Sequence, residues 1–263
     1  MKNLIFIEGV SGVGKSTTTP KLCKQLLDKG YSAAYYLEGD VQSPIDSFWN
    51  AFLTKTEYEN IRYTYPEYMD ELSENSIVFS DQVLVRYQDF MRRYYSPELY
   101  EYLKEHEFCY NPANPLPLEK YTKVFSDLWR RFAESEQKGN HYIILDGSFL
   151  HHQINDLIRN YNVSEGDIIN HLSELLKTVQ SLNPIVFYFA SQDVGERLSK
   201  AWDNRKKSAP TDEDIAYWKN RKEMDLRVLL KLPVEAYILD ISNEDWDSAL
   251  DMIYLRISKN DPM

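Results

Sequence analysis

The sequence predicts an α/β fold of three layers, with helices on both faces of a five-stranded parallel sheet and a large helical insertion after the second strand. Five short apolar segments are spread along the 263 residues, and stretches with apolar residues at three- and four-residue spacing separate them. Continuous apolar runs are typical of parallel strands that are buried on both faces. Their alternation with helices favours a parallel sheet with right-handed crossovers.

The first two strands flank a glycine-rich turn and a helix. The segment "NLIFIEG" is expected to form the first strand, and a helix is expected from about Lys15 to Lys29, with Gly30 ending it. The second strand is expected to end near Leu37. Between 41 and 138 apolar residues recur at helical spacing, as in "PLEKYTKVFSDLWRRFAESEQKG", so we expect helices and no strand there.

Three further strands complete the predicted sheet. They are expected in "HYIILDG", "NPIVFYFAS" and "EAYILDIS". A helical pair over 150–160 and 165–182 separates the first two of these strands. A long helical stretch from Val194 to Leu232 separates the next two, and a helix follows the last.

We expect one domain over 1–263, because the chain has no internal repeat and no low-complexity tract that would separate two domains. The expected core comprises 1–40 and 139–263, and the helical insertion comprises 41–138. Residues from about 197 to 222 are expected to form a lid.

The composition limits the classes of protein. The formal net charge is -11, which disfavours binding to nucleic acid, because phosphate contacts need a basic surface. No apolar run approaches the roughly 18–20 residues that cross a bilayer, so no membrane partner is expected. The two cysteines, Cys23 and Cys109, have no metal-ligand spacing and cannot form a disulfide framework, which fits a cytoplasmic protein.

A phosphate-binding motif follows the first strand. Residues 9–16, "GVSGVGKS", match G-x-x-x-x-G-K-[ST] between a strand and a helix, the context that this motif requires. Its backbone N–H groups can surround phosphate oxygens, Lys15 can reach the β- and γ-phosphates, and the Ser16 hydroxyl can bind Mg²⁺. The motif predicts a P-loop NTPase that binds ATP and Mg²⁺. The expected nucleotide-binding residues are Gly9, Ser11, Gly12, Val13, Gly14, Lys15, Ser16 and Thr17.

The chain resembles the thymidylate kinase and deoxynucleoside kinase group of P-loop kinases. The segment "IEGVSGVGKST", with Glu8 before the first glycine, is similar to the opening of these kinases. The segment "IVFYFASQDVGERLSKAWDNR" is similar to their fourth strand and the helix that leads into the lid. The resemblance implies an acceptor region after the second strand and a basic lid after the fourth. Residues 41–138 show no specific similarity to these kinases.

Two acidic residues follow the second strand. In "YYLEGD", Glu38 and Asp40 lie at the carboxyl end of a parallel strand, where ligands bind in open α/β sheets. The stretch resembles one in adenylylsulfate kinases, and an acid at this place in nucleoside kinases and chloramphenicol phosphotransferase orients the acceptor hydroxyl. We expect Asp40 to be the catalytic base, with Glu38 as the second choice, and both to contact the substrate. The alternative is that Asp40 lies in a turn and only forms a hydrogen bond with the backbone.

A third acidic residue ends the strand "YIILD". Asp146 is expected to hold a water molecule of Mg²⁺ and to form the metal site with Ser16. The alternative is that Asp146 is an acid at the turn that ends the strand and binds no metal. At the next position the chain departs from thymidylate and deoxynucleoside kinases, which have an Arg where this chain has Gly147. The missing guanidinium weakens the case for a nucleoside monophosphate acceptor.

The predicted lid is rich in basic residues. The resemblance implies that such residues stabilise the migrating phosphoryl group, and Arg197 and Arg205 match the family placement best. Arg221 is a further candidate if the lid folds as a helical hairpin. The alternative is a solvated helix face with charge pairs. The pair His151 and His152 either lines the acceptor pocket or only begins a helix.

The expected activity is ATP-dependent transfer of the γ-phosphate to a hydroxyl of a small molecule, with Lys15, Arg197 and Arg205 binding the phosphates. Between 38 and 138 acidic residues outnumber basic ones by 19 to 11, and much of the chain's tyrosine lies there. This favours a neutral or cationic acceptor such as a nucleoside or an antibiotic. The alternatives are a nucleoside monophosphate kinase, a nucleotide switch without an acceptor, and a polynucleotide end kinase. The sequence is compatible with a homodimer and does not require one.

Overall fold

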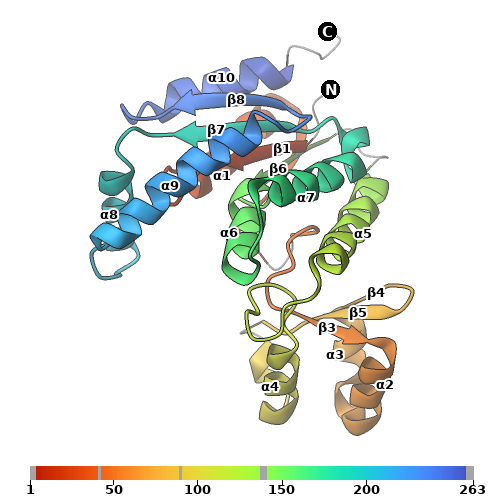
Figure 1. Cartoon of the computed structure of the whole chain (residues 1–263). Coiled ribbons are helices and arrows are strands. Elements are labelled where there is room, and N and C mark those ends of the chain that lie inside the picture. The colour runs from red at the N-terminus through yellow and green to blue at the C-terminus, as the bar shows by residue number, and fades with distance from the viewer. Residues whose placement is uncertain (1–3, 41–42, 89–90, 137–140, 259–263) are drawn as a thin grey trace.

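Figure 1 shows the computed structural model, which describes residues 4–40, 43–88, 91–136 and 141–258. An α/β core and a smaller lobe lie one above the other in this view, and helices α8 and α9 extend sideways from the core. Between core and lobe, the chain therefore offers two surfaces that face one another.

Five parallel strands form the main sheet, in the order β2–β6–β1–β7–β8. Strand β1 is central and pairs with β6 and β7, and all of its side chains are buried. The carboxyl ends of these strands meet at one edge, where Ile7 pairs with Asp146 and Glu8 pairs with Tyr188. The five predicted strands are confirmed. Their bounds are Leu4–Glu8 (β1), Ser32–Tyr36 (β2), His141–Asp146 (β6), Ile185–Ala190 (β7) and Glu235–Asp240 (β8).

Helices cover both faces of this sheet, so the three-layer α/β fold is confirmed. One apolar cluster joins the sheet to α1 and α10, and a second joins it to α5, α6 and α7. The helix after the P-loop begins at Lys15, as predicted. The bounds are Lys15–Asp28 (α1), Leu118–Glu136 (α5), Leu150–Asn160 (α6), Glu165–Thr178 (α7), Val194–Asn204 (α8), Asp212–Leu229 (α9) and Trp246–Ser258 (α10), with a short 3-10 turn at Gln180–Leu182.

The lobe has its own small sheet, with the antiparallel order β3–β5–β4. Three helices pack on this sheet, and the resulting apolar cluster contains none of the residues of the two clusters in the core. The bounds are Asn50–Thr54 (β3), Lys55–Thr64 (α2), Met69–Glu74 (α3), Ser76–Val78 (β4), Gln82–Arg86 (β5) and Pro97–Glu105 (α4), with 3-10 turns at Pro66–Tyr68 and Met91–Arg93.

The expectation that 41–138 contains no strand is therefore wrong. Strand β5, "QVLVR", is buried at four of its five positions, so its apolar residues form a run and do not alternate with polar ones. A short apolar run also fits the spacing of a helix, and pairing with β3 and β4 decides in favour of a strand. The helix predicted in "PLEKYTKVFSDLWRRFAESEQKG" is confirmed as α5 as far as Glu136, and its last residues lie outside the described part of the chain.

The predicted helical stretch from Val194 to Leu232 is two helices. Helix α8 ends at Asn204, and Thr211 begins α9 with a capping box in which its hydroxyl accepts from the N–H of Asp214. The two helices form an arm that extends beside the sheet (Figure 1). Across the described ranges no helix combines the length and the apolar content that crossing a membrane requires.

Candidate active site

The P-loop connects β1 to α1 and surrounds the Lys15 side chain. The Lys15 ammonium is buried and donates to the carbonyl of Gly9 at 2.9 Å and to that of Val10 at 3.3 Å. Ser16 and Thr17 are exposed at the first turn of α1. A helix N-terminus with free N–H groups and an ammonium beside it is a binding site for phosphate.

The loop must contain glycine because the start of the arm lies against it. Gly12 has a φ of +88°, and a Cβ there would lie 2.5 Å from the carbonyl oxygen of Arg197. Any larger residue would push the loop away from α8. The P-loop glycines therefore serve phosphate binding and also the contact between loop and arm.

Asp146 ends β6 behind the P-loop and fits a Mg²⁺ site. Its side chain is fully buried, and neither carboxylate oxygen is hydrogen-bonded among the described residues. Burial raises the pKa of this carboxyl, and the Lys15 ammonium and the Ser16 hydroxyl partly offset the rise. Unpaired carboxylate oxygens beside a serine hydroxyl are the oxygen donors that Mg²⁺ prefers. Asp146 and Ser16 would hold the ion, which in a P-loop protein neutralises charge on the phosphates.

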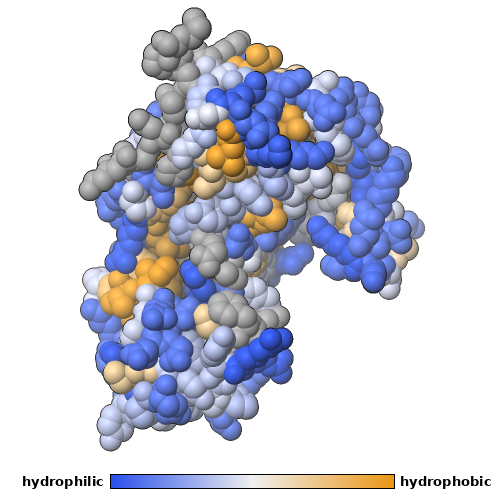
Figure 2. All heavy atoms as spheres, turned by 180° about the vertical axis from the view of Figure 1, so that it is seen from behind, coloured by the Kyte–Doolittle hydropathy of each residue, from blue (hydrophilic) through white to orange (hydrophobic). Residues whose placement is uncertain are grey.

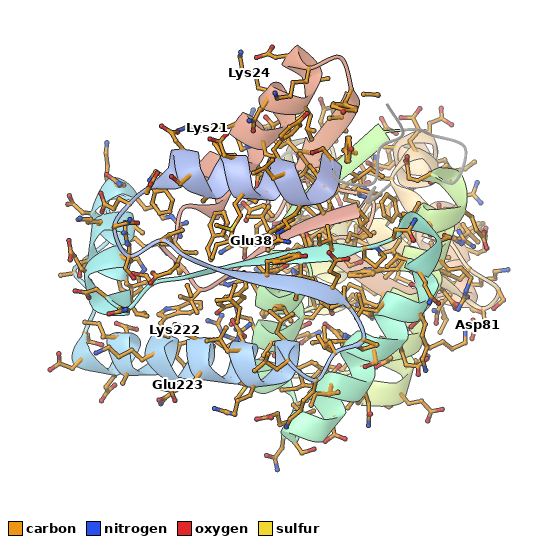
Figure 3. The ribbon with its side chains drawn as sticks, turned by 90° about the horizontal axis from the view of Figure 1, so that it is seen from above. Lys21, Lys24, Glu38, Asp81, Lys222 and Glu223 are labelled. Atoms are coloured by element: carbon orange, nitrogen blue, oxygen red, sulfur yellow. The ribbon has the colours of Figure 1, made fainter. Side chains whose placement is uncertain are left out.

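Glu38 lies in the cleft in front of Lys15, whereas Asp40 does not line it. Burial raises the pKa of Glu38, Lys15 lowers it, and the nearby Asp146 raises it further. One Glu38 oxygen lies 3.6 Å from Nε2 of His151. In Figure 3 Glu38 lies near the centre of the molecule, whereas Glu223 projects outward from α9. Burial raises the pKa values of Tyr36 and Asp46, and the charge of Asp40 adds a smaller rise to both, so Asp40 lies near these two groups.

Gly147 keeps the space between these groups open. Its φ is +66°, and a Cβ there would lie 3.3 Å from Cε of Lys15 and 3.7 Å from Oε2 of Glu38. A larger side chain would be strained and would crowd both groups. The glycine that departs from the kinase resemblance is therefore the residue that this arrangement requires.

The first lid arginine, Arg197, is turned toward the end of the sheet. Its guanidinium donates to the Glu244 carboxylate at 2.7 Å and to the carbonyl of Ile241 at 2.8 Å, and it lies 5.3 Å from the ring of Trp246. The ring of Trp246 also covers Gly14, where a Cβ would lie 3.2 Å from it. Arg197, Glu244 and Trp246 thus form the wall of the cleft next to the P-loop.

The other two lid arginines differ in position. Arg205 is exposed at the end of α8 and lines the cleft, and its positive charge helps to lower the pKa of Asp146 against the dominant effect of burial. Arg221 does not line the cleft. It is buried in α9, where it donates to Asp225 at 2.7 Å and to the carbonyl of Leu150 at 2.8 Å. Only Arg205 of these two can reach a ligand in the cleft.

One cleft of about 1200 Å³ lies between the core, the arm and the lobe, and it is lined by the P-loop together with Glu38, Arg197, Arg205 and Trp246. Figure 2 shows the hollow from behind, between the lobe below and the arm at the right. Such a volume exceeds that of a nucleotide-sized pocket and leaves room for a second small molecule. The P-loop lies at one end of the cleft, and the aromatic residues of the lobe lie at the other.

Aromatic side chains form the end of the cleft that is away from the P-loop wall. Phe48 and Tyr110 stack with ring centroids 5.1 Å apart, and Trp49 beside them is 43% exposed. His151 stacks on Trp218 of the arm at 5.4 Å. Of the two histidines, His151 lines the cleft and the buried His152 lies behind Phe48. Burial lowers the pKa of His151 well below its usual range, so the ring is neutral.

Most residues at this end of the cleft belong to no sequence motif. Phe48 and Trp49 precede β3, Tyr110 follows α4, and Arg159 lies on α6. The Tyr-rich composition was the only signal, because no short motif joins residues that are so far apart in the chain. The sequence did indicate that the acceptor region would be aromatic.

Comparisons with known proteins give a structural likeness only. No protein-family model and no curated protein matches the chain. A solved thymidylate kinase from Candida albicans is similar with a TM-score of 0.46 and 16% sequence identity, over 98% of this chain and 92% of that chain. That enzyme has a broad substrate specificity.

Proposed function

We propose that the protein is an ATP- and Mg²⁺-dependent phosphotransferase that acts on a hydroxyl of a small molecule. The observation that supports this most is the position of Glu38. Its carboxylate lines the cleft beside Lys15, between the P-loop and the aromatic end. An acid there can receive the proton of an acceptor hydroxyl, and the aromatic end of the same cleft gives room for the acceptor that carries it.

The donor nucleotide occupies the P-loop end of the cleft in this proposal. Residues 9–17 bind the phosphates, and Ser16 with Asp146 holds Mg²⁺. Arg205 stabilises charge on the transferred phosphoryl group. Arg197 has a different role from the one expected, because its guanidinium is held by Glu244 beside Trp246. We assign this wall to the base of the nucleotide, since an aromatic ring and a guanidinium are both surfaces on which a base stacks.

The catalytic base is Glu38 in this proposal, and Asp40 is the second choice. The raised pKa of Glu38 brings its proton affinity closer to neutral pH, where a base is most effective. The acceptor hydroxyl passes its proton to a Glu38 oxygen while its own oxygen forms the new bond to the γ-phosphorus and ADP leaves. The neutral His151 ring beside Glu38 keeps the carboxylate turned toward the cleft.

The acceptor lies against Phe48, Trp49 and Tyr110 and has a planar or apolar part. Glu38 and Glu107 line the same region, which favours an acceptor that is neutral or cationic. A nucleoside and an antibiotic with amines both fit these features. One observation favours a second candidate, a nucleoside monophosphate: Arg159 lines the cleft, with its guanidinium 6.0 Å from the ring of Tyr110.

The test is a measurement of ADP release from ATP with a library of nucleosides, nucleoside monophosphates and aminoglycoside-type antibiotics. We expect stimulation by a member of one class, loss of this stimulation in Lys15→Ala, and a phosphorylated product in mass spectrometry. Stimulation by monophosphates alone would favour the second candidate. If no acceptor stimulates and nucleotide only changes the affinity for another protein, the chain is a switch and the proposal is wrong.

A further inference from the structure

Three potential metal ligands meet behind the aromatic end of the cleft. One ligand atom each of Cys109, His152 and Asp156 lies within 4.8 Å of the other two, and all three residues are buried. His152 and Asp156 are one turn apart on α6 and therefore share a face of the helix. Cys109 is a free thiol in the segment that follows α4. The three residues come from distant parts of the chain, and the spacing of the cysteines gave no sign of them.

The His152 ring lacks the hydrogen bonds that a buried imidazole needs. The side chain is 1% exposed, and neither ring nitrogen has a hydrogen-bond partner among the described residues. Its nearest acid is Asp46, whose Oδ1 lies 3.5 Å from Nδ1. A neutral imidazole has a lone pair on one ring nitrogen, which can bind a metal. Buried nitrogens without partners are rare and call for a ligand.

Asp156 is held in place by donors from the surrounding chain. Its Oδ1 accepts from the N–H of Tyr110 at 2.8 Å and from the amide of Asn160, and its Oδ2 accepts from the hydroxyl of Tyr121 at 2.5 Å. Partners of this kind fix the direction of metal ligands in proteins. Asp46 lies beside Nδ1 of His152 at 3.5 Å, where it can orient the ring once Nε2 binds a metal.

The charges around Cys109 also favour a cation. Two buried acids lie close to it: an Asp156 oxygen is within 4.8 Å of the sulfur, and the Asp46 carboxylate lies 3.5 Å from His152. A divalent cation would offset this negative potential and would take the place of the thiol proton.

We propose that Cys109, His152 and Asp156 bind a Zn²⁺ ion. Sulfur, imidazole nitrogen and carboxylate oxygen together select Zn²⁺ over Mg²⁺, which prefers oxygen ligands alone. Binding releases the proton of the Cys109 thiol to solvent, and three protein ligands leave one position for water. The site differs from the Ser16 and Asp146 site at the P-loop and does not depend on the proposed phosphotransferase activity.

The ion would join the lobe to the core. Cys109 belongs to the chain that leaves the lobe, whereas His152 and Asp156 belong to α6 on the core sheet. Phe48 and Tyr110, which form the aromatic end of the cleft, both pack against the His152 ring. Zn²⁺ would therefore fix the aromatic wall relative to the P-loop end without touching the nucleotide.

The test uses the full chain and metal alone. The apoprotein is titrated with Co²⁺ as a spectroscopic substitute for Zn²⁺, and Zn²⁺ content is measured by mass spectrometry after dialysis against Zn²⁺. We expect a single Zn²⁺ per chain and a Co²⁺ spectrum with a thiolate-to-metal charge-transfer band. Cys109→Ser should lose the band, and Cys23→Ser, which removes the other buried thiol, should retain it. Asp46→Asn should retain the band with an affinity reduced roughly 10- to 100-fold.

Two results would overturn the proposal. One is a wild-type protein that keeps no Zn²⁺ and shows no charge-transfer band, as expected if Cys109 only donates a hydrogen bond to Asp156. The other is a band that persists in Cys109→Ser. Circular dichroism of each variant shows whether it is folded, and His152→Gln supplies a second ligand variant if Cys109→Ser does not fold. Zn²⁺ should also raise the melting temperature of the wild type and of Cys23→Ser, but not that of Cys109→Ser.

Discussion

Single residues near the P-loop show how one type of side chain serves different purposes. Glu8 is buried at the end of β1 and accepts from the N–H groups of Phe149 and His151 at 2.8 and 2.9 Å, so it caps the start of α6. Glu38 instead lines the cleft, and its side chain is 37% exposed. Burial and hydrogen bonding thus distinguish a structural acid from one that can meet a substrate.

The first prediction concerns the proposed base. Glu38→Gln keeps the size of the side chain but removes the proton acceptor, and we expect kcat for acceptor phosphorylation to fall by roughly 10²- to 10⁴-fold. Asp40→Asn is the matched control and should change kcat less than Glu38→Gln does, because Asp40 does not line the cleft. Steady-state ADP release with the acceptor found in the library decides between them. A larger loss in Asp40→Asn would return the role of base to Asp40.

The second prediction concerns pH and Glu8. Burial raises the pKa of Glu8 from 4.5 to about 8, against the opposing effect of its two backbone N–H donors. Between these values the native state binds the proton and the unfolded chain does not, so the free energy of unfolding falls as pH rises. Glu8→Gln should remove this part of the fall, at most about 1.4 kcal/mol per pH unit. Urea unfolding at about pH 5, 6.5 and 8 measures it.

The exposed Glu101 on α4 gives the control for this experiment. Glu101→Gln should leave the pH dependence as it is in the wild type. Burial also raises the pKa of Asp46, to about 6. Asp46 therefore lowers the free energy of unfolding as pH rises over a lower pH range, and it does so equally in all three proteins. Equal slopes for wild type and Glu8→Gln between about pH 6.5 and 8 would show that Glu8 is ionised in the native state.

At the scale of elements, buried polar contacts attach α9 to the core. Arg221 and Asp225 form an ion pair within α9, and both side chains are at most 1% exposed. Arg221 also donates to Asn155 and to the carbonyl of Leu150 on α6, and Tyr188 of β7 donates to Asp225 at 3.0 Å. The arm therefore has a fixed base, whereas its far end carries the exposed Arg205.

The third prediction tests this attachment. Asp225→Ala leaves the guanidinium of Arg221 buried without its partner, so we expect the free energy of unfolding to fall by about 3–5 kcal/mol. Glu165→Ala is the control, because it removes the exposed pair that Arg227 of the same helix makes at 3.1 Å and should have little effect. Denaturant unfolding of both variants gives the comparison. If the free energy of unfolding fell equally in the two variants, burial of the ion pair would not explain its contribution to stability.

At the scale of the whole molecule, the two ends of the cleft lie on parts that share one packed face. Leu84 of β5 belongs to an apolar cluster of the core, so one face of the lobe sheet packs on the core. The cluster around the fully buried Leu103 of α4 contains no residue of the P-loop or of α1, so damage to it is expected to leave the P-loop folded. Nucleotide binding and acceptor phosphorylation should therefore be separable.

The fourth prediction follows from this division. Leu103→Ala leaves a cavity in the lobe that costs about 2–5 kcal/mol of stability. We expect the variant to bind ATP with the affinity of the wild type in calorimetry but to lose most acceptor-dependent ADP release at the same acceptor concentration. Leu26→Ala, at a fully buried position on α1 beside the sheet, is the matched control and should weaken ATP binding as well. Equal effects of the two variants on ATP binding would contradict the separation.

Local patterns in the sequence determined the sheet, the P-loop and the helix that follows it, because each depends on residues that are adjacent in the chain. They also placed Glu38, Asp40 and Asp146 after the correct strands. Three features depend on which segments pack together: the position of Glu38, but not Asp40, along the cleft, the buried place of Arg221 and the strand at β5. So do the stacked Phe48 and Tyr110 and the cluster around His152. Only the tertiary structure decides these features, since contacts between distant segments leave no periodic signal in the sequence.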